Sequence, residues 1–142
     1  MTIEIHECTE RDYIKISRAL TKFNLDHLPK NSSDSMTSIG YVVKDPVAGV
    51  VVGGVCGKLL LGNCLSIDIL WMEPKFRNLG HASKLMQALE KAALKLGSHL
   101  SIVDTFDFQA LGFYEKCGYT VFGVLDDCPC VGNKRYYLKK AL

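Results

Sequence analysis

Apolar and polar positions alternate with two different periods along this chain, and the change of period marks its elements. From Ser66 to Met72 the residues are apolar on both faces, with Asp68 as the one charge. Such a run is typical of a central strand that is buried on both sides. Strict alternation predicts two faces, one made of Ile67, Ile69 and Trp71 and the other of Asp68, Leu70 and Met72.

A helical pattern follows this strand. Its apolar positions recur every three or four residues, at Ala82, Leu85, Met86, Leu89, Ala93 and Leu96. Between strand and helix stands Pro74, which has no backbone N–H to donate to a sheet, so the strand is expected to end there. Gly97 is expected to terminate the helix. The stretch from Ser66 to Gly97 therefore predicts a strand, a sharp turn and a helix.

Shorter patterns predict the remaining elements. These are a strand at 2–6, a helix capped by Thr9 and Asp12, strands at 39–44, 50–61 and 100–105, a helix at 109–117, and strands at 119–125 and 135–140. The segment 24–38 lacks periodicity and gathers Ser, Asn, Asp and Pro, so a loop or a broken short helix is expected there. Three glycines in the strand at 50–61 indicate a bulge or a closely approaching neighbour: Gly53, Gly54 and Gly57.

The order of these elements predicts the fold class. Short turns between the strands at 39–44, 50–61 and 66–72 favour an antiparallel meander. A helix connects the last of these strands to the one at 100–105, so that pair should be parallel, with a right-handed crossover. We therefore expect an α+β protein whose mixed β-sheet combines an N-terminal antiparallel meander with a parallel central pair, flanked by about four helices.

Length and charge restrict the function classes. The chain has 142 residues, 48% hydrophobic and 23% charged, which suits a single globular domain spanning 1–142. A net charge of +2 is too small to indicate a nucleic-acid partner. The sequence contains no apolar run long enough to span a membrane and no signal-peptide core at its start. A cytoplasmic protein without a membrane partner is expected.

The six cysteines raise the question of a metal or a disulfide. Cys128 and Cys130 form the only close pair, and they lack a second pair or a suitably spaced histidine. A disulfide between them would be strained. Free thiols are therefore favoured, and no metal site is expected.

The turn between the central strand and its helix has the composition of an anion site. Gly80 and the small Ala82 stand where a helix begins, so backbone N–H groups without an intrahelical partner and the helix dipole would face a ligand there. Lys75 and Arg77 add mobile positive charge. Many strand-to-helix connections contain a glycine, so a purely structural turn is the alternative.

Two motifs, in this order, resemble those of the GNAT superfamily, the general-control-related N-acetyltransferases. The first is L-W-M-E-P-x-F-R-x-x-G-x-A-S-x-L-M, in which Arg77, Gly80 and Ala82 match the pattern R/Q-x-x-G-x-G/A. The second is A-L-G-F-Y-E-K-C-G-Y, from Ala110 to Tyr119, which resembles A-x-x-F-Y-E-K-x-G-F/Y. The resemblance covers about the last two thirds of the chain and is thin before Ile39.

The resemblance implies a site for acetyl-CoA as acetyl donor. In this family the central strand splays from its parallel neighbour, and the gap admits the pantetheine arm. The positions that would bind the arm through the backbone are Leu70 and Met72, and the N–H groups that would bind the pyrophosphate are those of Arg77, Asn78, Leu79, Gly80, His81 and Ala82. Asp107 stands where many members carry an Asn that orients the arm; an ionised Asp accepts but cannot donate, which leaves that contact in doubt.

The resemblance also implies catalytic candidates. Tyr114 occupies the position of the acid that protonates the departing thiolate, and a phenol with an ordinary pKa near 10 is protonated at pH 7; the alternative is a core aromatic. Asp68 is the candidate base that takes the ammonium proton, directly or through water. It could instead bind the ammonium or make a structural hydrogen bond. Ser66 stands where histone-acetylating relatives have a glutamate, and it cannot replace that base.

These residues predict an acetyl-CoA-dependent N-acetyltransferase that acts on a primary amine of a small molecule or peptide by direct attack in a ternary complex. The alternative is a non-catalytic acyl-CoA-binding sensor or regulatory module. A Rossmann-type domain is disfavoured, because its glycine fingerprint would follow the first strand. The acceptor is not encoded in a recognisable motif, and its determinants are expected at 24–38 and 126–133. The oligomeric state stays open, a homodimer included.

Overall fold

The computed structural model describes residues 1–30, 32 and 36–142 of the chain, which forms two compact units. The first unit comprises Met1–Asp34 and the second Ser35–Leu142. Each unit is described by itself.

The first unit contains helix α1, Glu10–Asp26. The capping box predicted at its start is confirmed: the Thr9 hydroxyl accepts from the Asp12 N–H at 3.3 Å, and the Asp12 carboxylate accepts from the Thr9 N–H at 3.0 Å. The helix extends to Asp26, three residues into the expected loop. The strand predicted at 2–6 is wrong, since these residues form no regular element. A strand needs a neighbour for its backbone hydrogen bonds, and the described part of this unit offers none.

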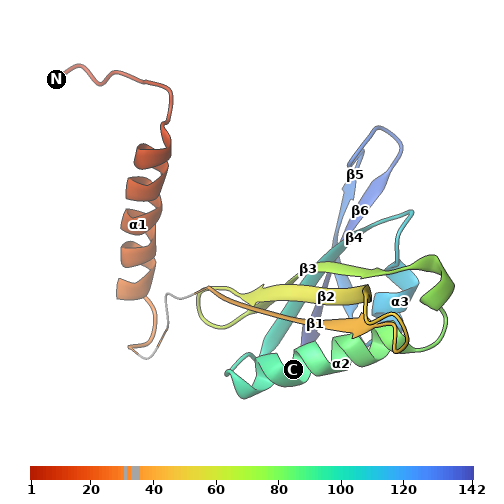
Figure 1. The fold of residues 1–142 in the computed structure, drawn as a ribbon. Helices are drawn as coiled ribbons and strands as arrows, with labels where there is room; N and C mark the ends of the chain where they lie inside the picture. The colour runs from red at the N-terminus through yellow and green to blue at the C-terminus, as the bar shows by residue number, and fades with distance from the viewer. Residues whose placement is uncertain (31, 33–35) are drawn as a thin grey trace. The chain divides into compact units, whose positions relative to one another are not determined.

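The second unit is built on one six-stranded sheet (Figure 1). Its strands are β1 (Thr37–Lys44), β2 (Val51–Leu59), β3 (Leu65–Met72), β4 (Leu100–Phe106), β5 (Thr120–Asp126) and β6 (Lys134–Ala141). They lie in the order β1-β2-β3-β4-β6-β5. Only β3 and β4 are parallel, and the other neighbours are antiparallel. The predicted meander and parallel central pair are confirmed.

Two α-helices and a 3-10 turn accompany the sheet. They are α2 (His81–Lys95), α3 (Leu111–Lys116) and the turn η1 (Pro74–Phe76). The described residues thus hold three α-helices, where about four helices were expected. Most of the apolar stripe predicted for α2 packs in one cluster with apolar residues of β2 and β3: Leu85, Met86, Leu89 and Ala93 with Val55, Leu59, Leu65, Ile67 and Met72. Of the other two predicted members, Ala82 is partly buried and Leu96 is exposed. This packing holds α2 against the sheet and fixes where the helix begins.

A bulge in β3 corrects the predicted face assignment. Gly57 pairs with Ile67 and the preceding Cys56 pairs with Ile69, so Asp68 is an extra residue in β3. An inserted residue shifts the alternation by one position. Ile67 is consequently buried, whereas Ile69 and Trp71 are exposed, so these three do not share a face.

Asp68 is affected by the same bulge. Its carboxylate is exposed and lies 3.6 Å from the ammonium of Lys58 on β2, whereas Met72 is buried in the core. The expectation that Asp68 shares a face with Met72 is therefore wrong.

Glycines allow β2 to approach β3 closely, as their spacing predicts. A Cβ on Gly53 would collide with the sulfur of Met72 and would lie 2.8 Å from the carbonyl oxygen of Trp71. A Cβ on Gly57 would lie 2.5 Å from the carbonyl oxygen of Ser66. Both distances are too short for any side chain, so these positions need glycine.

The parallel pair at the centre of the sheet opens along its length. β3 and β4 are in register only at Leu65 with Ser101 and at Ser66 with Ile102. On its other side β4 remains paired with β6 from Leu100 to Phe106. The carboxyl end of β3 therefore diverges from β4, and the gap opens toward η1 and α3.

Candidate active site

A cavity of about 1050 Å³ lies at the open ends of β3 and β4. Its lining comes from four segments: Asp68–Met72 of β3; Phe76, Arg77, Asn78, Gly80, His81, Ala82 and Ser83; Asp104 and Thr105 of β4; and Phe108, Gln109, Ala110, Gly112, Phe113 and Tyr114. Sites for small molecules and cofactors are typically about 300 to 1,000 Å³. The cavity is therefore large enough for an extended ligand.

A row of backbone donors borders the cavity where α2 begins. Gly80, the residue before the helix, has φ +79°, and Asn78 has φ +60°. Among the described residues, no acceptor receives a hydrogen bond from the N–H groups of Asn78 to Ser83. The N–H of Arg77 differs, since it donates to the carbonyl of Pro74 at 3.2 Å. The donor row thus begins at Asn78, and the helix dipole makes it attractive to an anion.

Arg77 supports this turn through its side chain. Its Nε donates to the carbonyl oxygen of Met72 at 2.8 Å, which ties the segment after η1 to the end of β3. This bond leaves the positive guanidinium beside the donor row. Because the contact joins residues on either side of Pro74, it fixes the direction in which the chain leaves the sheet.

Tyr114 contributes both to the core and to the cavity. It is 6% exposed, and its ring meets those of Phe113 and Tyr119 edge-on, with centroids 5.4 and 6.0 Å apart. Its hydroxyl has no hydrogen-bond partner in the described residues. Within those residues, every fully buried side-chain oxygen does have a hydrogen-bond partner. The hydroxyl is therefore accessible, and the residue lines the cavity. Burial raises the pKa of Tyr114 to about 12, and the charges of Cys117 and Asp104 add to this effect.

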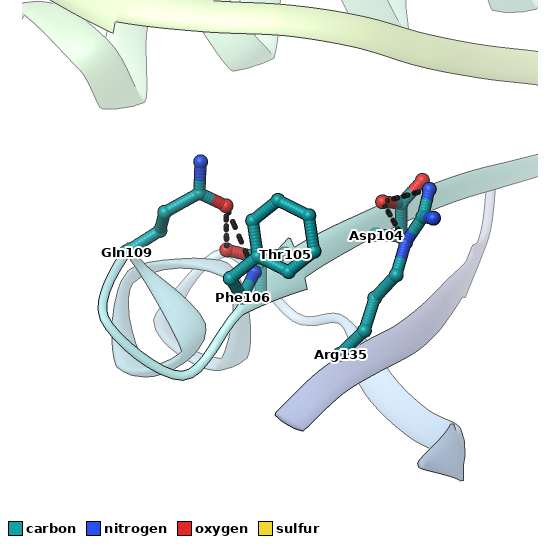
Figure 2. Close-up of polar contacts among 5 residues, drawn as sticks. All are labelled: Asp104, Thr105, Phe106, Gln109 and Arg135. Atoms are coloured by element: carbon teal, nitrogen blue, oxygen red, sulfur yellow. Dashed lines mark hydrogen bonds and ion pairs between the residues drawn. The ribbon is translucent and has the colours of Figure 1, made fainter. Parts of the chain in front are cut away.

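Two carboxylates line the cavity, one from each splayed strand. Asp68 comes from β3, and Asp104, which the sequence did not single out, comes from β4. Asp104 is held by Arg135, whose Nε and Nη2 both lie 2.7 Å from its Oδ2 (Figure 2). The signal that could have indicated Asp104 is its place near the carboxyl end of the strand parallel to β3.

A second set of hydrogen bonds, which the sequence did not indicate, holds the loop between β4 and α3 (Figure 2). The side-chain oxygen of Gln109 accepts from the backbone N–H of Phe106 at 2.8 Å and from the Thr105 hydroxyl at 3.2 Å. The Thr105 oxygen in turn accepts from the N–H of Ala110 at 3.3 Å. No motif signals this arrangement, because it depends on the loop conformation.

The structure brings most of the predicted site residues to one cavity. The residues that line it are Tyr114, Asp68, Leu70, Met72, Arg77, Asn78, Gly80, His81 and Ala82. Leu79 and Asp107 lie outside the lining. Asp107 instead accepts from the Asn133 side-chain amide at 3.2 Å, and its N–H donates to the Lys134 carbonyl at 2.9 Å. It therefore joins the loop after β4 to the turn before β6.

The segments expected to select the acceptor are described unequally. Part of 24–38 lies outside the described residues, at 31 and 33–35. The turn at 127–133 joins β5 to β6 and is held by the Asp127 carboxylate, which accepts from the Gly132 N–H at 2.8 Å. Phe108 lines the cavity, and the ring of Phe106 stacks on it with the centroids 5.4 Å apart.

In 1–30, 32 and 36–142, no three His, Cys, Asp or Glu side chains gather where they could hold a metal ion. Within the same ranges, no helix has the length and apolar character needed to cross a membrane.

A mixed sheet with a splayed parallel pair, a donor row at a helix start and a tyrosine with an accessible hydroxyl thus meet at one cavity. The model of the GNAT acetyltransferase family matches residues 4–119. The chain therefore belongs to the GNAT acetyltransferase family, and the resemblance predicted from its two motifs is confirmed. Acetyl-CoA is the acetyl donor of GNAT acetyltransferases.

Individual relatives agree with this assignment. Blasticidin-S acetyltransferase from Streptomyces morookaense is 35% identical over 82 residues, which cover 57% of this chain and 60% of that protein. An acetyltransferase from Agrobacterium fabrum is 35% identical over 75 residues, 53% of this chain and 54% of the relative. The match thus spans less than two thirds of either relative.

Solved structures are similar over a greater length. A crystal structure of an acetyltransferase from Bacillus cereus has a TM-score of 0.89 at 31% identity, covering 99% of this chain and 98% of that one. Aminoglycoside 6′-N-acetyltransferase complexed with coenzyme A has a TM-score of 0.67 at 17% identity, covering 97% of both chains, and shares the fold. The predicted α+β fold class is confirmed.

Proposed function

We propose that this protein transfers an acetyl group from acetyl-CoA to a primary amine of a small molecule or peptide, by direct attack in a ternary complex. One observation carries the proposal: most of the donor row, at 78 and 80–83, lines the same cavity between the splayed strands as Tyr114, whose hydroxyl is accessible. Relatives named for their action on antibiotics favour a small-molecule acceptor.

The cavity fits the donor molecule in three respects. The free N–H groups from Asn78 to Ala82 suit a diphosphate, with the charge of Arg77 beside them. The stretch of β3 that contains Leu70 and Met72 has no partner on its β4 side, so its backbone can bind an extended amide-containing arm. The volume of about 1050 Å³ accommodates both.

Acetyl transfer requires a neutral amine, a fixed carbonyl group and a proton donor for sulfur. Holding two reactants in position can contribute about 7 to 11 kcal/mol. The amine nitrogen forms a bond to the carbonyl carbon as the carbon–sulfur bond breaks. Tyr114 donates its hydroxyl proton toward the departing sulfur. With a pKa of about 12, its phenol is protonated at neutral pH.

Asp68 is the proposed base. It lines the cavity from the bulge of β3, where its carboxylate is exposed and within reach of an amine or a water molecule that enters the cavity. The ammonium of Lys58, 3.6 Å away, orients the carboxylate. Binding the substrate ammonium is the second role that this position allows.

A binding assay and a turnover assay together test the proposal. Acetyl-CoA should raise the melting temperature, and a coupled-thiol screen over polyamines, aminoglycosides, amino acids and short peptides should reveal an acceptor. Binding without thiol release over the whole panel would favour a non-catalytic acyl-CoA sensor instead. An unchanged melting curve in the presence of acetyl-CoA would contradict both functions.

A further inference from the structure

We propose that the side-chain amide of Gln109 donates a hydrogen bond to a carbonyl oxygen on the arm of the bound acyl-CoA. This inference rests on the proposed function, because it requires an acyl-CoA in the cavity. Gln109 belongs to neither motif of the sequence, and its role follows from its contacts alone.

The orientation of the amide is fixed by the groups around it. Gln109 Oε1 lies 2.8 Å from the backbone N of Phe106. A backbone N–H can only donate, so the side-chain atom that faces it has to be the oxygen and not the nitrogen. This contact removes the usual ambiguity between the two ends of a glutamine amide.

Thr105 reinforces the same orientation. It is 2% exposed, and its oxygen accepts from the Ala110 N–H at 3.3 Å, so its own proton is free to be donated to Gln109 Oε1 at 3.2 Å. Two donors therefore converge on the Gln109 oxygen. A side chain held in this way has already lost most of its conformational freedom, so a ligand bond to it costs less entropy.

The amide nitrogen is the end that remains free. It has no acceptor among the described residues, and Figure 2 shows it pointing away from the loop between β4 and α3. Gln109 itself lines the cavity. An amide NH₂ carries two donors and no acceptor, so it selects an oxygen on the ligand.

The position of Gln109 favours the arm of the donor molecule. Gln109 lies five residues before Tyr114, both residues line the cavity, and the proposed function places Tyr114 at the sulfur. The same proposal places the phosphates at the donor row, in the segment 78–82 between β3 and α2. The part of acyl-CoA between sulfur and phosphates contains amide and thioester carbonyls, which are matched acceptors for an NH₂ group. Asp107, two residues earlier, is already bonded to Asn133 and cannot donate when ionised.

The test is the Gln109→Glu variant. Glutamate keeps an oxygen for Phe106 and Thr105 and replaces only the NH₂ group by an acceptor. Isothermal titration should show acetyl-CoA binding weakened about tenfold, as expected for the loss of a hydrogen bond to the ligand. Binding of 3′,5′-ADP, which lacks the arm, should be unchanged. Gln109→Met, which is neutral, should weaken acetyl-CoA binding to a similar degree.

A matched control separates the contact from the added charge. Gln87→Glu places the same charge on the exposed surface of α2, outside the cavity, and should leave both affinities unchanged. Equal acetyl-CoA affinity in wild type and both Gln109 variants would overturn this inference and leave the proposed function intact. Equal losses of affinity for acetyl-CoA and 3′,5′-ADP would overturn it too, as would an effect only on the KM of the amine. If the wild type itself fails to bind acetyl-CoA, the proposed function fails.

Discussion

The guanidinium of Arg77 donates from Nε to the carbonyl oxygen of Met72 at 2.8 Å, across the turn that contains Pro74. The contact joins the end of β3 to the start of the donor row. The two halves of the proposed site, the strand that faces the arm and the turn that faces the diphosphate, are thereby held at a fixed spacing.

Loss of Arg77 should therefore affect both structure and binding. Arg77→Met removes the bond to Met72 and the positive charge next to the donor row, and acetyl-CoA affinity should fall by about tenfold or more at low salt. The measurement is isothermal titration at two salt concentrations. Lys75→Met is the control, because Lys75 lies in the same turn but is mostly exposed, with an ion pair to Glu73 at 3.8 Å. Equal losses of acetyl-CoA affinity in both variants would mean that Arg77 contributes only through its charge.

The left-handed conformation of Gly80 predicts a second effect. Its φ is +79°, and a Cβ there would meet no atom within 4 Å, so Gly80→Ala would be strained without a clash. Denaturant unfolding should show a loss of about 1 kcal/mol, and the turn should bind acetyl-CoA more weakly because the donor row is displaced. Gly49→Ala has the same kind of strain, at φ +70°, outside the cavity. It should lose similar stability and keep its affinity; a matching loss of affinity would contradict the site.

The hydroxyl of Tyr114 should matter for turnover and not for binding. Tyr114→Phe should lower kcat about 100-fold or more while leaving the Kd of acetyl-CoA unchanged, since a proton donor typically contributes about 10² to 10⁴. Steady-state rates with an identified amine test this. Tyr119→Phe is the control, because its hydroxyl bonds to Ser101 at 2.8 Å and Glu90 at 3.0 Å. It should lower stability and leave kcat nearly intact, and the reverse pattern would exclude Tyr114 as the acid.

The pKa of Tyr114 also predicts how stability depends on alkaline pH. Burial raises this pKa to about 12, above the value near 10 in an unfolded chain, so the folded state favours the protonated phenol. The corresponding stabilisation, about 2 to 3 kcal/mol, is fully present below pH 10 and is lost as the pH rises to 12.

Urea unfolding at pH 9, 10 and 11 should show this decline. Tyr114→Phe should decline less steeply. It should keep part of the slope, because burial also raises the pKa of Tyr119. Identical slopes in wild type and variant would mean that Tyr114 ionises as easily in the folded chain as in the unfolded one.

Asp68 is predicted to contribute to kcat. Asp68→Asn preserves its shape and removes its basicity, so kcat should fall about 100-fold with an unchanged Kd for acetyl-CoA. A raised KM for the amine at a nearly normal kcat would instead assign Asp68 to ammonium binding. Asp104→Asn is the matched control, since Asp104 lines the same cavity but is engaged by Arg135. A comparable fall in kcat there would remove the distinction between the two carboxylates.

The central part of the fold could be predicted because its local signals agree. The apolar run before Pro74, the glycine at the helix start and the three-to-four spacing after it each indicate the same strand, turn and helix, and β3 and α2 follow them closely. The capping box at Thr9 was predictable for the same reason, since both of its partners lie within four residues.

Features that depend on distant partners could not be predicted. The bulge at Asp68 arises from how β2 pairs with β3, and alternation within one strand contains no sign of the inserted residue. Asp104 and Gln109 reach the cavity because β4 and the loop after it face the open side of β3. The strand predicted at 2–6 is wrong for a related reason, since its pattern indicates a half-buried strand but does not provide a partner.

The divergence of β3 from β4 leaves a gap at the centre of the sheet, beyond the paired residues Ser66 and Ile102. β6 pairs with β4 along its length, and β2 pairs with β3. Because these pairings keep both strands in place, the gap is present before a ligand binds. An elongated ligand with amide groups can take the place of the missing strand and bond to the main chain. Recognition along that edge would then tolerate replacement of the Leu70 side chain by another apolar residue, because peptide groups, which every sequence possesses, provide the contacts.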